Sequence, residues 1–116
     1  PRPARGPAAS SSSSSSSSTP AHAPATEIAA ATLARGTRLV QLGAFESAEA
    51  ARAEWDRLAA LFPQIAAKAR VVEAAESGGR AFWRLRAHGF AGEEDSRLFC
   101  RDILAAGRAC IPVAQR

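Results

Sequence analysis

The chain has 116 residues, of which 47% are hydrophobic. Because 29 residues are alanine and only 25 are larger apolar residues, one small domain is expected and a second large catalytic domain is excluded. The net charge of +4 is spread along the chain, so the charge does not indicate a clustered nucleic-acid surface.

Neither a membrane span nor a signal peptide is expected. No apolar run reaches about 18 residues, and no charged start is followed by an apolar core. Because the first residue is proline and not methionine, we expect a fragment or a processed product.

Residues 1–36 are predicted to be a disordered low-complexity linker. Nine consecutive serines lie between segments rich in proline and alanine, and no large apolar side chain occurs before residue 26. Such a composition cannot offset the entropy lost on ordering. Only residues 26–34 have the composition of a short helix, with Thr26 as its N-cap and Gly36 as its stop.

Residues 37–116 are predicted to form the folded domain, which begins with a strand at residues 38–42. Ser47 then has the position of a helix N-cap. The buried stripe of that helix recurs at helical spacing and comprises Ala51, Trp55, Leu58 and Phe62. Pro63 ends the helix or starts the next turn.

A β-hairpin, a second helix and a last strand follow. Residues 70–74 and 80–87 are predicted strands, and Ser77-Gly78-Gly79 is typical of the turn between them. The second helix begins near Gly92 with acidic residues in its first turn and ends at Gly107. Its apolar stripe comprises Phe99, Cys100 and Ile103. Residues 109–114 form the last strand, where Pro112 favours a sheet edge.

The resulting order, βαββαβ, predicts an α+β fold of the ferredoxin-like or RNP-like type. In this fold two helices cover one face of an antiparallel four-stranded sheet. The other face stays open and is the expected place for function.

Alternation along the strands assigns side chains to the open face. This assignment buries Val40 and Leu42 in the first strand and Trp83, Leu85 and Ala87 in the third. The outward residues are then Leu39, Gln41, Gly43, Phe82, Arg84 and Arg86. An amide, a flat ring and guanidinium forks suit a polar extended ligand that carries a carboxylate or phosphate. Alternatively, the arginines only solvate the face and the ring packs against the turn.

Two stretches resemble the SPOR (sporulation-related repeat) domain family. RLVQLGAF at residues 38–45 is similar to its opening strand with a Gln, followed by a Gly-Ala-Phe corner. GGRAFWRLRAHGFAG at residues 78–92 is similar to its second signature, an aromatic-Arg-x-Arg strand followed by a second Phe corner. The resemblance covers about residues 37–114.

The resemblance implies a non-catalytic periplasmic module that binds peptidoglycan glycan strands, favouring strands without stem peptides, as at division septa. It places glycan contacts at Gln41, Phe82, Arg84 and Arg86, and it implies no cofactor. Division or cell-wall remodelling proteins are further candidate partners, and the parent protein would be membrane-anchored or secreted. We hypothesise that Arg84 or Arg86 pairs with the lactyl carboxylate that an amidase leaves on muramic acid.

Cys100 and Cys110 can meet, because the second helix turns at Gly107 and returns as a strand. In an oxidising compartment they would form a disulfide, and two buried free thiols are the alternative. Two thiols and two scattered histidines are too few for a metal site, and no nucleophile turn or phosphate loop indicates an enzyme.

Two other functions stay open. An RNA-binding module would use the same sheet, but its first strand needs an aromatic residue where this chain has Gln41. A protein-interaction domain of an envelope complex would use an outer helix face. His88, near the end of the third strand, is either a ligand contact or, as we favour, a solvent-facing turn residue.

Overall fold

The computed structural model describes residues 25–116, so residues 1–24 of the predicted linker lie outside the described residues. The rest of the predicted linker, residues 25–36, is ordered, because its backbone pairs with the sheet. The elements in chain order are η2 (Ala30–Thr32), β1 (Arg38–Phe45), α2 (Ala48–Leu61), α3 (Pro63–Ala66), β2 (Ala69–Ser77), β3 (Arg80–His88), α4 (Glu93–Ala105) and β4 (Ile111–Ala114). The strands form one antiparallel sheet in the order β2-β3-β1-β4. This confirms the predicted α+β fold, with the short helix α3 added after α2.

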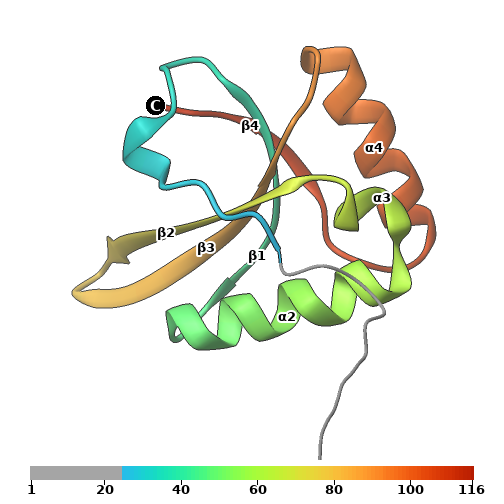
Figure 1. Cartoon of the computed structure of the whole chain (residues 1–116). Helices are drawn as coiled ribbons and strands as arrows, with labels where there is room; N and C mark the ends of the chain where they lie inside the picture. Colours follow the sequence, from blue (N-terminus) through green and yellow to red (C-terminus); the bar gives the residue numbers. More distant parts are fainter. Residues whose placement is uncertain (1–24) are drawn as a thin grey trace, which may run out of the picture.

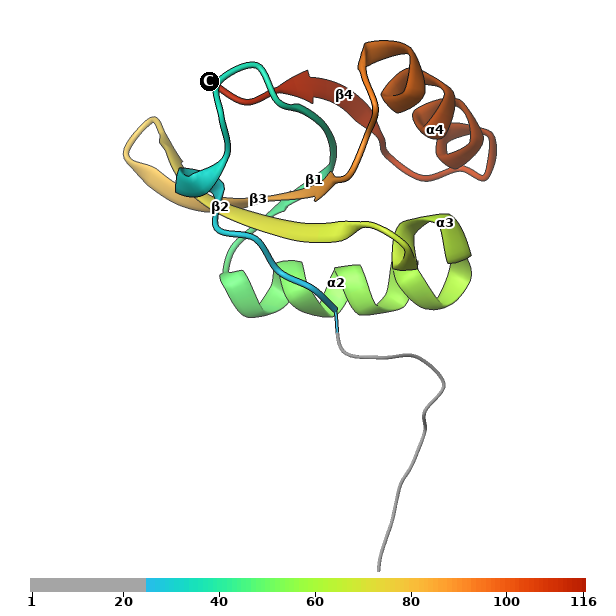
Figure 2. The same cartoon turned by 45° about the horizontal axis from the view of Figure 1, so that its top comes forward.

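The two long helices leave one face of the sheet open (Figures 1 and 2). α2 packs against β1, β2 and β3, whereas α4 packs against β1 and β4. Trp55 of α2, Ile103 of α4 and Leu85 of β3 belong to one buried cluster. A single core therefore joins both helices to the same side of the sheet.

Local signals in the sequence explain where the elements begin and end. Ser47 accepts a hydrogen bond from the Ala50 N–H at 3.0 Å, as an N-cap does. Gly78 and Gly79 have φ angles of 59° and 80°, which a two-residue hairpin turn requires and which other residues rarely adopt. Pro112 lies in the edge strand β4, as predicted.

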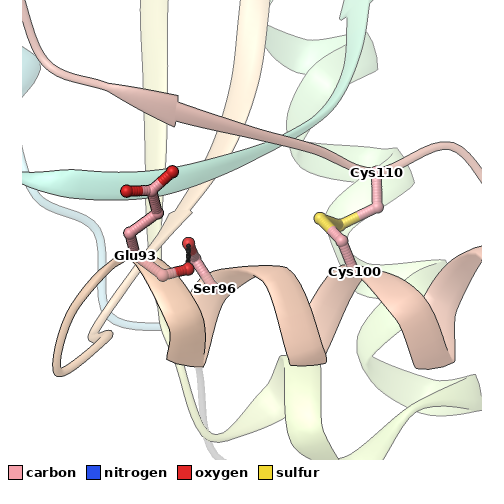
Figure 3. Close-up of a disulfide and its surroundings, with 4 residues drawn as sticks. All are labelled: Glu93, Ser96, Cys100 and Cys110. Atoms are coloured by element: carbon pink, nitrogen blue, oxygen red, sulfur yellow. Dashed lines mark hydrogen bonds between the residues drawn. A yellow bond between two sulfur atoms is a disulfide. The ribbon is translucent and has the colours of Figure 1, made fainter.

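A disulfide joins Cys100 of α4 to Cys110, which directly precedes β4 (Figure 3). The two Cα atoms are 5.1 Å apart, and both residues are buried in the core. One helical turn before Cys100, the buried Ser96 donates its hydroxyl to the Glu93 carbonyl at 2.7 Å. The disulfide thus holds the edge strand β4 against α4, and the alternative of two free thiols is wrong.

Residues 26–34 do not form the predicted helix. Glu27 instead makes a parallel β-bridge with Arg70 at the outer edge of β2, and only Ala30–Thr32 forms a turn of 3-10 helix. Ile28 N–H donates to the Arg70 carbonyl at 2.8 Å, and Arg70 N–H donates to the Thr26 carbonyl at 2.7 Å. A helix this short is marginal alone, whereas the edge of β2 offers unpaired backbone groups.

Residues 26–37, which we call the strap, run from the edge of β2 to the end of β4. Gly36 N–H donates to the Gln115 carbonyl at 2.7 Å, and Gln115 N–H donates to the Thr37 carbonyl at 2.9 Å. In Figure 2, η2 lies between β2 and the C-terminal end of the chain. Leu39 and Val71 are 0% exposed although neither belongs to the helix-side cluster. The strap therefore covers this end of the open face.

Candidate functional site

A β-bulge in β1 decides which of its residues face outward. Gln41 pairs with Arg86, but Gly43 pairs with Leu85, so the register shifts between them. The extra residue reverses the alternation, and Gly43 lies on the same face as the buried Leu85. The expectation that Gly43 belongs to the open face is therefore wrong. Its missing side chain leaves room for Phe45, whose Cζ would lie 2.9 Å from a Cβ at Gly43.

Beyond the strap, the open face carries a groove of about 820 Å³. Gln41 of β1, Glu73 of β2 and Arg84 and Arg86 of β3 line it. Arg35 and Gly36 of the strap and residues 113–116 complete the lining. Three of the four predicted binding residues thus lie together in one concave site.

Arg86 orients Gln41. Its Nε donates to Gln41 Oε1 at 3.0 Å, and its Nη1 donates to Glu73 Oε1 at 3.2 Å. Because a guanidinium only donates, the atom of Gln41 that faces it must be the oxygen. The Gln41 amide nitrogen is therefore directed away from Arg86, and its two N–H groups are not used in this contact.

Arg86 is the most enclosed charge of the groove, with 8% of its surface exposed. Burial lowers its pKa; Glu73 opposes this shift, and nearby Arg84 and Arg116 add to it. Arginine nevertheless remains protonated in proteins. The ion pair between Arg86 and Glu73 thus helps to fix the shape of the groove.

Arg84 is more accessible than Arg86. Its side chain is 36% exposed, and its Nη1 lies 4.0 Å from Glu73 Oε1, too far for a hydrogen bond. The guanidinium carbon lies 5.3 Å from the centroid of the Phe82 ring, which gives a cation–π contact. Phe82 does not line the groove and borders a separate shallow hollow with Phe45 and Arg80.

The sequence analysis missed Arg35, Glu73 and Arg116 as groove residues. Two signals could have found them. Because β1 and β4 are antiparallel neighbours, a residue just before β1 lies near one just after β4. Glu73 alternates with Val72 in β2, so it faces the same side as Val71.

His88 is the last residue of β3, where it pairs with Leu39 and Ala69. Its side chain is half-buried and does not line the groove. It is thus neither a groove residue nor fully exposed to solvent.

Residues 25–116 hold neither a metal-ion cluster nor a membrane-spanning helix. In this part of the chain no group of three or more His, Cys, Asp and Glu side chains gathers as a metal ion would need. None of the helices described is long and apolar enough to cross a membrane.

An antiparallel sheet that is covered on one face and carries a polar groove on the other defines a class of small binding modules. The sequence of residues 34–114 matches the SPOR domain. The chain therefore belongs to the SPOR domain family, whose members are peptidoglycan-binding domains of bacterial envelope proteins and are not catalytic. Comparisons with curated proteins and with solved structures each found no significant match.

Proposed function

We propose that this chain is a non-catalytic module that binds peptidoglycan glycan strands lacking stem peptides. The observation that carries the proposal is the groove on the open sheet face of a SPOR domain, with the Gln41 amide held in place by Arg86. Glycan strands without peptides expose acetamido and hydroxyl oxygens, which accept hydrogen bonds from amide and guanidinium N–H groups.

The disulfide supports a periplasmic location, since disulfides form and persist in oxidising compartments. Division septa are the expected site of action, because amidases strip stem peptides there. Partners among division or cell-wall remodelling proteins are consistent with that location.

The lining of the groove argues against RNA as the ligand. Single-stranded RNA is held by bases that stack on aromatic side chains. Among residues 25–116 no aromatic side chain lines the groove, and one side of the Phe82 ring already contacts Arg84. The groove thus offers hydrogen-bond donors and charge without a stacking surface.

The proposal is tested by co-sedimentation of the full chain with purified sacculi, before and after an amidase has removed the stem peptides. We expect pelleting to increase after stripping. Gln41→Glu keeps an acceptor for Arg86 but removes the two amide donors, so it should lower pelleting by about tenfold.

The matched control is Gln64→Glu, the same substitution at an exposed position of α3, away from the groove. It should pellet like the native chain, as should any folded variant outside the groove. Absence of pelleting with both kinds of sacculi would refute the proposed function. Equal loss in both variants would show that added charge, and not the Gln41 donors, matters.

A further inference from the structure

The groove has an excess of positive charge, and most of these charges form no close ion pair within residues 25–116. In the part of the chain that the structure describes, four arginines and one glutamate line it: Arg35, Arg84, Arg86, Arg116 and Glu73. The two most enclosed of these, Arg86 and Glu73, pair with each other. Among the described residues of the lining, three guanidinium groups therefore remain without a matching side-chain carboxylate.

These three groups come from separate parts of the chain. Arg35 lies in the strap, Arg84 lies in β3 and Arg116 lies in the segment after β4. Arg35 and Arg116 are exposed, and among the described residues neither forms an ion pair within 4.0 Å. Arg84 has only the 4.0 Å approach to Glu73. Their N–H donors are thus available to an anionic ligand.

A guanidinium group binds a carboxylate more strongly than it binds a neutral amide. Its planar fork binds a carboxylate through two parallel hydrogen bonds, which a neutral amide cannot match. When an amidase hydrolyses the bond between muramic acid and its stem peptide, water adds across the amide. The lactyl carbonyl takes the hydroxyl of water and becomes a carboxylate, and the peptide nitrogen takes the proton and leaves as a free amine. A stripped strand therefore carries one negative charge on every disaccharide.

We propose that Arg84 and Arg116, with Arg35 beside them, bind the lactyl carboxylates of stripped strands, so that the groove recognises stripped glycan by its charge. This inference rests on the proposed function and names the group that is recognised. Of the two arginines in the sequence hypothesis it favours Arg84, because Nε and Nη1 of Arg86 are already engaged by Gln41 and Glu73. Arg86 is a positioning residue, and the ligand charge is met by the more exposed arginines.

The experiment compares two forms of the same stripped sacculi. One form keeps its lactyl carboxylates, and in the other they are converted to neutral methylamides by carbodiimide coupling to methylamine. The full chain should bind the carboxylate form about tenfold more tightly, and the difference should shrink as salt is raised. Sacculi treated with methylamine but no carbodiimide control for handling.

Variants of the groove should shift this preference in opposite directions. Arg84→Gln and Arg116→Gln should each weaken binding to the carboxylate form by about three- to tenfold, and should weaken binding to the methylamide form by less, so that the preference for the carboxylate form shrinks. Glu73→Gln still accepts from Arg86 but removes the negative charge, so it should strengthen binding to the carboxylate form. Arg101→Gln, on the exposed surface of α4, should change neither.

The outcomes separate the inference from the proposed function. Equal binding to both forms would overturn the recognition of charge while leaving glycan binding intact. Binding to neither form would overturn both. The inference would also be overturned if Glu73→Gln had the same unfolding temperature as the native chain but bound the carboxylate form more weakly. Tighter binding to polyuridine RNA than to stripped sacculi, with the same arginine dependence, would assign the groove to nucleic acid instead.

Discussion

Gln41 and Arg86 line the same groove, where Arg86 holds the Gln41 amide in place by a hydrogen bond. Sequence alternation placed both on the open face, and the structure pairs them across β1 and β3. Alternation could not predict that Arg86 is only 8% exposed, or that its Nε and Nη1 donate hydrogen bonds to Gln41 and Glu73. Burial depends on neighbours in three elements, so it does not follow from the pattern of one strand.

A side chain at Gly43 should destabilise the fold. A Cβ there would lie 2.9 Å from Phe45 Cζ, and Phe45 packs against the core. We expect Gly43→Ala to lower the free energy of unfolding by about 1–2 kcal/mol, measured by urea denaturation.

The cost should disappear when the ring that causes it is shortened. In a Phe45→Leu background, Gly43→Ala should therefore be nearly neutral, because the far end of the ring is gone. A full penalty in that background would place the cause in the β1 backbone and not in the Phe45 contact.

Glu27 should make the stability of the strap depend on pH. The hydrogen bond from Arg52, at 3.0 Å, lowers the pKa of Glu27; burial opposes this shift, and Arg70 at 2.7 Å adds to it. Because the folded pKa lies below the unfolded value of about 4.3, the stabilisation is full above that value. It is lost as the pH falls through the lowered folded pKa.

The native chain should accordingly unfold at a higher urea concentration than Glu27→Gln at pH 7 and at pH 5. The gap should close towards pH 3. Glu46→Gln, which removes a carboxylate that pairs with no basic side chain in the described residues, is the control and should show little gap at any pH. A Glu27 gap that widened on acidification would contradict this assignment.

At the scale of elements, the strap shows where local pattern reasoning failed. Residues 26–34 have helical composition, but their backbone pairs with the edge of β2 because the sheet supplies partners that an isolated segment lacks. The longer helices and the hairpin were predictable, since capping residues, apolar spacing and turn glycines are local signals.

The disulfide should stabilise the packing of α4 against β4. Cys100 and Cys110 are ten residues apart, and closing a loop of that length is worth about 2.5 kcal/mol in the chain-entropy model. We expect the double variant Cys100→Ala/Cys110→Ala to lose about this free energy of unfolding.

Guanidinium denaturation of the native chain, the reduced chain and the double variant measures the effect. Neither cysteine lines the groove, so pelleting with stripped sacculi at low temperature should persist in the double variant. A double variant as stable as the oxidised native chain would show that the disulfide adds nothing to the fold.

For the whole molecule, the contacts of the strap lead us to propose that the folding unit begins near residue 25. The composition predicted a boundary at residue 37. A chain beginning at residue 37 would expose part of Leu39 and Val71, which are 0% exposed in the structure. It should be less stable by about 2–4 kcal/mol than a chain beginning at residue 25.

Thermal and urea unfolding of these two chains decide between the boundaries. The shorter chain should also bind stripped sacculi more weakly, because it lacks Arg35 and Gly36 of the groove. Equal stability would place the boundary at residue 37 and leave the strap as a peripheral attachment.

Three features could be predicted from the amino-acid sequence alone: the order of the elements, the sheet face of Gln41, Arg84 and Arg86, and the family. These features depend on short-range periodicity, capping and motif spacing, which are set by residues close together in the sequence. The bulge that turns Gly43 inward, the path of the strap and the presence of Arg35 and Arg116 in one groove became known from the three-dimensional structure. Each depends on which strands lie side by side, and such contacts between distant residues leave no local signature in the chain.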